Sequence, residues 1–302
     1  MEKDLAEKNP PCPSAPALMR EFSITPKKDK GQNFLKDPST ARMIVSRAQI
    51  GPDERVLEIG PGLGALTFLL AGAAKSVVAV EWDRKLAEVL SRQLELSGLT
   101  NARIIREDVL NVDFGEIAAL SGGPLTVVSN LPYCLSSPIL VKIVEARKSV
   151  TRAILMFQKE LADRITSLPG SREYGRISVL AQYAATIKTI ASIGRDQFIP
   201  RPAVDSVVVE ISFNPSPAYP AKSEELFFEV VKAAFGQRRK TLKNSLAGSS
   251  LGLSSGDIET ALKNAGIDPS RRAETLSLAE FAALSDSVGE IEGLVGDKEN
   301  GS

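Results

Sequence analysis

A glycine-rich segment followed by a carboxylate indicates a site for a nucleoside cofactor. Gly60, Gly62 and Ala65 match the pattern G-x-G-x-x-G/A, whose glycines permit a tight turn between a strand and a helix. Glu81 ends the next apolar segment, where a carboxylate can accept hydrogen bonds from ribose hydroxyls. The alternative is a simple tight turn before a helix. NAD and S-adenosylmethionine both contain adenosine, so this loop alone does not separate them.

Three further observations favour S-adenosylmethionine. Glu58 precedes the first glycine, where dinucleotide-binding loops usually keep the strand end apolar. Asp108 follows the third apolar segment, where it can accept a hydrogen bond from an adenine amino group; the alternative is a helix cap or a turn residue. A dehydrogenase needs a proton donor, but the chain has no histidine and none of its four tyrosines has a lysine four residues later.

The segment Asn130-Leu131-Pro132-Tyr133 follows the fourth apolar strand and suits an exocyclic amine of a nucleic-acid base. Such an amine is a poor nucleophile because its lone pair is delocalised into the ring. The Asn130 side-chain oxygen and the Leu131 or Pro132 carbonyl could accept its two N–H bonds, and positioning would carry most of the catalysis. Tyr133 offers a face for stacking, worth about 1–3 kcal/mol per base. The alternative is a Pro-Tyr turn packed on the core.

The composition of the 302 residues excludes several other kinds of site. The absence of histidine rules out a Ser-His-Asp triad and histidine-ligated metals. The two cysteines, Cys12 and Cys134, exclude a disulfide framework and a multi-cysteine zinc site, so no metal is expected. No apolar run is long enough for a membrane span, and the charged start lacks a signal sequence. We therefore expect a cytoplasmic protein without a membrane partner.

The elements that position these groups alternate between strands and helices, which predicts an α/β sheet that is mostly parallel. The last two strands have only a short connection and should form an antiparallel hairpin at one edge. The predicted strands are 55–59, 76–81, 102–106, 125–129, 152–157, 187–193 and 204–213. The predicted helices of this part are 37–49, 63–73, 83–97, 114–120, 137–147 and 159–167.

The remaining sequence predicts a small all-helical C-terminal domain over 222–285, joined by the proline-rich linker 215–221 to the α/β domain, 30–214. Its helical patterns cover 223–235, 238–247, 257–265 and 277–285. Five prolines and no helical or strand period indicate a disordered arm over 1–29. Residues 286–302 form an acidic tail.

Together these segments resemble the ribosomal RNA adenine N6,N6-dimethyltransferases, in particular the KsgA-type small-subunit enzymes. The resemblance covers about 27–285 and implies a Rossmann-like class I methyltransferase domain that uses S-adenosylmethionine. The matching segments are KGQNFL from Lys30, EIGPG from Glu58, NLPY from Asn130, LMFQKE from Leu155, EYGRISVLAQY from Glu173, FIPRPAVDS from Phe198 and FGQRRKTLKNSL from Phe235.

The resemblance also implies a role for individual site residues. Asn130 would touch both the methionine end of the cofactor and the target amine. Phe198 would lie opposite Tyr133, so that two rings hold the adenine; without the resemblance, Phe198 is equally a core aromatic. The implied cofactor-binding residues are Gln32, Asn33, Leu35, Gly60, Gly62, Glu81, Asp108 and Asn130.

Four basic residues share one segment without acids: Arg238, Arg239, Lys240 and Lys243. Taken alone, such a run is typical of a solvated helix face. The resemblance implies contact with the RNA backbone, which would make binding sensitive to salt.

The family's activity implies dimethylation of N6 on two adjacent adenines in the 3′-terminal hairpin of small-subunit rRNA, with a role in ribosome biogenesis. The substrate would be an immature 30S particle, and the enzyme a monomer. One alternative is a large-subunit (23S) rRNA methyltransferase of the antibiotic-resistance type. Another is a non-catalytic nucleic-acid-binding relative, against which the intact Asn130–Tyr133 segment and Glu81 argue.

Overall fold

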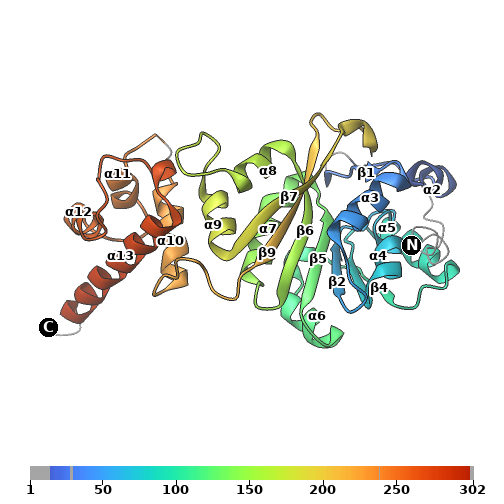
Figure 1. The fold of residues 1–302 in the computed structure, drawn as a ribbon, viewed down its shortest axis with the longest axis horizontal. Helices are drawn as coiled ribbons and strands as arrows, with labels where there is room; N and C mark the ends of the chain where they lie inside the picture. The colour runs from blue at the N-terminus through green and yellow to red at the C-terminus, as the bar shows by residue number, and fades with distance from the viewer. Residues whose placement is uncertain (1–13, 28–29, 238, 300–302) are drawn as a thin grey trace. The chain divides into compact units, whose positions relative to one another are not determined.

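The computed structural model describes residues 14–27, 30–237 and 239–299 (Figure 1). The chain divides into two compact units. The described residues up to Ala162, together with Thr186–Phe213, form the first unit. Asp163–Ala185 and the described residues from Asn214 onward form the second.

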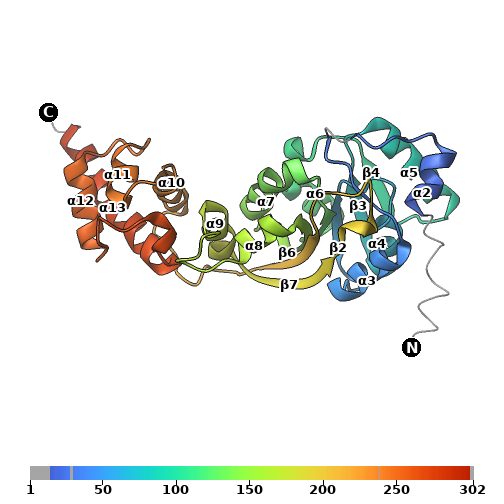
Figure 2. The same ribbon diagram turned by 90° about the horizontal axis from the view of Figure 1, so that it is seen from above.

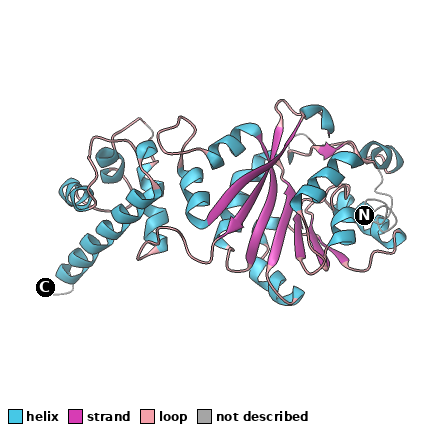
Figure 3. Ribbon diagram, in the orientation of Figure 1, coloured by secondary structure: helices cyan, strands magenta, loops and turns pink. Residues whose placement is uncertain are grey.

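A seven-stranded sheet in the order β4-β3-β2-β5-β6-β9-β7 carries the first unit (Figure 3). The strands β4, β3, β2, β5 and β6 are parallel, and β9 pairs antiparallel with β6. The predicted α/β class is confirmed, and the last two strands lie at one edge as predicted. The bounds are β2 Arg55–Ile59, β3 Ser76–Val80, β4 Ala102–Ile105, β5 Leu125–Asn130, β6 Val150–Gln158, β7 Ala185–Ile193 and β9 Ser206–Phe213.

Helices cover both faces of the sheet, which explains why its central strands are nearly continuous apolar runs. Figure 2 shows α3 and α7 on opposite faces. Ile44 of α3 and Leu70 of α4 pack against Val56 and Ile154 on one of them. The bounds are α3 Pro38–Ala48, α4 Thr67–Ala73, α5 Arg84–Leu96, α6 Phe114–Ser121, α7 Ser136–Glu145 and α8 Lys159–Thr166.

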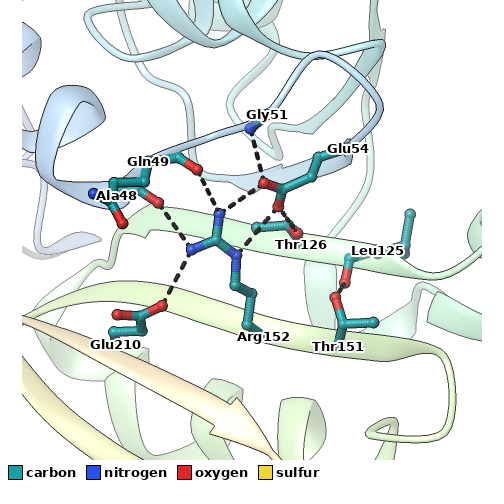
Figure 4. Close-up of polar contacts among 9 residues, drawn as sticks. All are labelled: Ala48, Gln49, Gly51, Glu54, Leu125, Thr126, Thr151, Arg152 and Glu210. Atoms are coloured by element: carbon teal, nitrogen blue, oxygen red, sulfur yellow. Dashed lines mark hydrogen bonds and ion pairs between the residues drawn. The ribbon is translucent and has the colours of Figure 1, made fainter.

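A cluster around Arg152 fixes the amino-terminal ends of the parallel strands (Figure 4). Its guanidinium lies 2.7 Å from Glu54 and 3.1 Å from Glu210 and also donates to the carbonyls of Ala48 and Gln49. This arrangement satisfies the donors of a half-buried arginine at the end of the sheet opposite the glycine-rich loop. It therefore has a structural role.

The segment predicted as a disordered arm contains a helix, α2, at Ala15–Glu21. Ala15, Leu18 and Ile24 are buried against Phe34 and Leu63. The prediction of disorder is therefore wrong for this part of 1–29, because a short apolar face finds a partner that the sequence does not reveal. Residues 1–13 lie outside the described residues.

The first unit also contains a two-stranded sheet that was not predicted from the sequence. Phe34–Leu35 (β1) pairs antiparallel with Phe198–Ile199 (β8), with Leu35 opposite Phe198. Strands of two residues carry no detectable alternation, so this pairing could not be predicted. It places two segments that contain predicted site residues, Leu35 and Phe198, side by side.

The second unit is helical, as predicted, but it is larger than 222–285. Its core includes Phe227, Leu242 and Phe281, all fully buried, and Tyr183 stacks on Phe227 with ring centroids 4.0 Å apart. Tyr174 also joins this core, so 163–185 belongs to this unit. Its helices are α9 Arg176–Ala184, α10 Glu224–Ala234, α11 Leu242–Ala247, α12 Ser255–Asn264 and α13 Leu278–Glu299.

The expected acidic tail from 286 onward is, up to Glu299, a continuation of α13. Val288 is fully buried and Ile291 is 8% exposed, so apolar positions extend the helix past the predicted end at 285. By contrast, the predicted linker 215–221 contains neither helix nor strand.

Candidate active site

A cavity of about 310 Å³ lies where β2, β3 and β5 end, at the carboxyl edge of the parallel sheet. Open α/β sheets bind ligands at this edge. The structure places every predicted cofactor-binding residue in the cavity wall: Gln32, Asn33, Leu35, Gly60, Gly62, Glu81, Asp108 and Asn130.

The glycine-rich loop after β2 forms part of the cavity wall. Gly60, Gly62 and Gly64 have φ of 64°, 58° and 84°, the left-handed region that favours glycine. A Cβ on Gly62 would lie 2.9 Å from Phe34 Cε1, and one on Gly64 would lie 2.5 Å from Leu90 Cδ1. The loop therefore needs glycine for both conformation and space.

Glu81 ties the end of β3 to this loop. It is 4% exposed, and its two carboxylate oxygens accept from the backbone N–H groups of Gly62 (3.1 Å) and Asp83 (2.9 Å). Burial raises the pKa of Glu81 above its ordinary value. The carboxylate is thus held rigidly at the cavity wall, where it can accept further hydrogen bonds.

Glu58 is a second buried carboxyl group in the same wall. It is 2% exposed, and within the described part of the chain its Oε2 has no hydrogen-bond partner. Burial raises the pKa of Glu58 to about 8, and the negative charge of Glu81 adds to this effect. Glu58 is therefore mostly protonated at neutral pH and offers a neutral polar group to a ligand.

Asp108 and Trp82 form another part of the wall. Asp108 Oδ1 accepts from Leu110 N at 2.9 Å and so caps a short 3-10 helix, Val109–Asn111. Its other oxygen is not needed for the cap, so Asp108 can both cap this helix and accept a hydrogen bond from an adenine amino group. Trp82, the only tryptophan, is 50% exposed, and Lys30 Nζ lies 3.5 Å from its ring centroid. Trp82 directly follows Glu81 in the chain but was not predicted as a site residue.

The residues before β1 form the opposite wall and are held by their own amides. Gln32 Oε1 accepts from Lys27 N at 2.8 Å, and Asn33 Nδ2 donates to Gly31 O at 3.1 Å. These bonds fix the side chains of Gln32 and Asn33 beside β1. Cys134 also lines the cavity and is exposed.

The turn after β5 presents a defined set of acceptors. Asn130 Nδ2 donates to Asn33 O at 2.9 Å, which leaves the Asn130 Oδ1 atom as an acceptor. Pro132 O already accepts from Leu135 N at 3.0 Å and from Ser136 Oγ at 3.1 Å. Both lone pairs of the Pro132 carbonyl are therefore used, and Leu131 becomes the better of the two backbone acceptors that the sequence left open.

Tyr133 and Phe198 are not among the described residues that line the cavity. The Tyr133 hydroxyl lies 2.9 Å from Ser206 Oγ, and burial raises the pKa of this phenol. Phe198 is 3% exposed and packs in the core with Leu35 and Ile44. The expected arrangement of two rings around an adenine stays a prediction.

The basic residues differ in their surroundings. Arg238 lies outside the described residues. Arg239 and Lys240 are exposed in the turn before α11, which begins at Leu242 and not at 238. Lys243 Nζ lies 2.6 Å from Glu259 Oε2, so its charge is partly neutralised. We call Arg238, Arg239 and Lys240 the basic run.

The chemistry of the cavity wall fits S-adenosylmethionine. The glycine-rich main chain, the fixed carboxylates of Glu81 and Asp108, and the buried Glu58 carboxyl group, whose Oε2 has no hydrogen-bond partner within the described residues, suit a polar, cationic adenosine derivative. In the described residues, no group of three or more His, Cys, Asp or Glu side chains is placed to hold a metal ion. Every helix there is too short or too polar to span a lipid bilayer.

Comparisons with known proteins agree with this site. The family model described as ribosomal RNA adenine dimethylase matches residues 24–289. A protein of Desulforapulum autotrophicum named ribosomal RNA small subunit methyltransferase A is 46% identical over 91% of this chain and 96% of its own. A protein of Pelotomaculum thermopropionicum with the same name is 45% identical over 89% and 94%.

Solved structures show the same fold. A dimethyladenosine transferase from Plasmodium falciparum has a TM-score of 0.68 at 24% identity, over 83% of this chain and 95% of its own. The 23S rRNA methyltransferase ErmE has a TM-score of 0.62 at 25% identity, over 85% and 99%. The chain belongs to the ribosomal RNA adenine dimethylase family, whose members are S-adenosylmethionine-dependent methyltransferases.

Proposed function

We propose that this enzyme transfers methyl groups from S-adenosylmethionine to N6 of two adjacent adenines in the 3′-terminal hairpin of small-subunit rRNA. The fixed orientation of the Asn130 amide beside the cofactor cavity is the observation that carries this proposal, because it sets an acceptor where a base amine must be held. The names of relatives at 41–46% identity support the small subunit as the source of the RNA.

Asn130 Oδ1 and the Leu131 carbonyl accept the two N–H groups of the target amine. These contacts draw the nitrogen lone pair out of conjugation with the purine ring and direct it toward the cavity. When bound, the cofactor supplies an electrophilic methyl group on a sulfonium. Positioning replaces a strong base, since the extra proton can leave after transfer. This agrees with a chain that has no histidine.

The ring of Tyr133 provides a stacking surface for the adenine. Its hydroxyl is bonded to Ser206, and burial raises its pKa, so the phenol stays protonated and no phenolate base is part of this role. Phe198 is proposed to contact the opposite face of the adenine. Only 3% of Phe198 is exposed, so this contact requires the segment around β8 to open when RNA binds.

For the cofactor, we assign Glu81 to the ribose hydroxyls, Asp108 to the adenine amino group and Gly60 to the methionine part. Gln32, Asn33 and Leu35 close the cavity from the N-terminal side. Binding of RNA is assigned to the basic run and Lys243. The substrate is an immature 30S particle in the cytoplasm, and the enzyme acts as a monomer.

The test is transfer of tritium from labelled cofactor to immature 30S particles that lack the modification. Primer extension should then show new stops at two adjacent adenines near the 3′ end of the small-subunit rRNA. A stop in the large-subunit rRNA would instead support the 23S alternative, in line with the fold shared with ErmE. Binding of particles without uptake of label would support a non-catalytic binder.

A further inference from the structure

The turn Asn130–Tyr133 after β5 is held at both of its ends by residues outside it. At one end, Asn130 Nδ2 donates to Asn33 O at 2.9 Å. At the other, the Tyr133 hydroxyl lies 2.9 Å from Ser206 Oγ. Asn33 directly precedes β1, and Ser206 is the first residue of β9. The orientation of the turn therefore depends on two segments that are far apart in the sequence.

These two supporting segments are themselves joined. Leu35 of β1 pairs with Phe198 of β8, and Lys36 N donates to Gln197 O at 2.8 Å. The loop between β8 and β9 is braced by Arg195, which precedes β8. The Arg195 guanidinium donates to the Ala203 carbonyl at 3.0 Å, and its backbone N–H donates to Asp205 Oδ1 at 2.9 Å. Ser206 then enters the main sheet opposite Gln158 of β6. The serine hydroxyl is thus presented from a rigid frame.

Because Tyr133 and Ser206 are both at least partly shielded from water, their contact favours one orientation of the Tyr133 ring. Ser206 is fully buried, so its hydroxyl has no access to bulk water. Tyr133 is half-buried, and a phenol that loses its partner there would have to turn toward solvent or stay unsatisfied. The bond therefore selects one orientation of the ring within the short helix Tyr133–Leu135.

We propose that Ser206 is a positioning residue for methyl transfer: it fixes the ring of Tyr133 so that the target adenine is stacked beside Asn130. This inference rests on the proposed function. In it, the Tyr133 hydroxyl bonds to Ser206 and does not contact the RNA. Tyr133 and Ser206 act as one unit, so that removing either hydroxyl has the same effect as removing both.

The test measures kcat and KM for methylation of immature 30S particles by Ser206→Ala, Tyr133→Phe and the double variant. Loss of one buried hydrogen bond should lower kcat/KM about threefold to tenfold in each single variant. The double variant should be no slower than either single variant. Cofactor affinity, measured by the fluorescence of Trp82, should stay within about twofold of wild type in all three variants.

Thr126→Val is the matched control. Thr126 is also a buried residue whose hydroxyl is bonded, to Glu54, but it lies at the opposite end of the sheet. Its kcat/KM should remain near that of wild type. If Ser206→Ala does not fold, Tyr133→Phe removes the same bond from the half-exposed partner, and its kcat/KM decides the question alone.

The proposal is overturned if Ser206→Ala and Tyr133→Phe methylate at the wild-type rate, or if their losses multiply in the double variant. It is also overturned if cofactor affinity falls as much as kcat/KM, because the serine would then support the cavity and not the ring. These results all require a wild-type enzyme that methylates the particles. Absence of transfer by wild type would contradict the proposed function itself.

Discussion

Replacement of Asn130 separates catalysis from cofactor binding. The side chain has two uses: Nδ2 binds Asn33 O at 2.9 Å, and Oδ1 is the proposed acceptor for the target amine. Asn130→Ala removes both. Loss of one preorganised hydrogen-bonding group at a reacting centre typically costs about 100-fold or more in kcat, or ~2.7 kcal/mol. We therefore expect transfer to fall by at least about 100-fold, whereas cofactor affinity changes by less than about threefold.

Asn130→Asp divides the effect into its parts. A carboxylate keeps an acceptor but cannot donate to the Asn33 carbonyl. Methyl transfer by this variant should therefore be faster than by Asn130→Ala and slower than by wild type. Asn101→Ala is a matched control, because Asn101 Nδ2 also donates to carbonyls, those of Ala71 and Ala74, at 2.8 and 3.2 Å. Single-turnover tritium transfer and calorimetry with the cofactor give the two quantities. An equal loss of transfer and of cofactor affinity in Asn130→Ala would refute the assigned role.

Three further results are expected. Glu81→Ala should weaken cofactor binding by about tenfold or more, since it removes the proposed ribose acceptor and the bond to Gly62 N; unchanged affinity in calorimetry would place the ribose elsewhere. Glu58 has a folded pKa of about 8, above its ordinary value, so the folded state binds its proton more tightly than the unfolded chain does. The free energy of unfolding should fall as pH rises from about 5 to 8, and urea titrations should show a weaker decline for Glu58→Gln; equal slopes would contradict this pKa. Alanine replacement of the basic run should reduce the salt dependence of particle binding, and Lys243→Ala should reduce it less, because Glu259 already pairs with that lysine. An unaltered slope would make the basic run an ordinary solvated surface.

Much of the sheet could be predicted because its strands are buried on both faces. Apolar runs such as 125–129 and 76–81 begin at the same residue as the strands and end within one residue of them. By contrast, α9 was missed because its segment, Arg176–Ala184, is mostly buried and shows no clear polar face. The two-residue strands β1 and β8 are too short to leave a pattern.

The cofactor-binding residues could be predicted for a similar reason: a glycine-rich turn and the acids that follow it are set by local chain geometry. What could not be predicted depends on contacts between distant segments. Nothing in the sequence indicates that Pro132 O is occupied, that Ser206 supports Tyr133, or that Phe198 is 3% exposed. The limits of the helical unit were missed because Tyr174 belongs to a core built mostly from later residues.

A crystal structure of the chain with S-adenosylhomocysteine would test the central claim most directly. The account predicts the ribose against Glu81, the adenine beside Asp108 and the sulfur facing the turn that begins at Asn130. Clear density for the ligand elsewhere on the molecule, or in the cavity with its sulfur turned away from that turn, would contradict it.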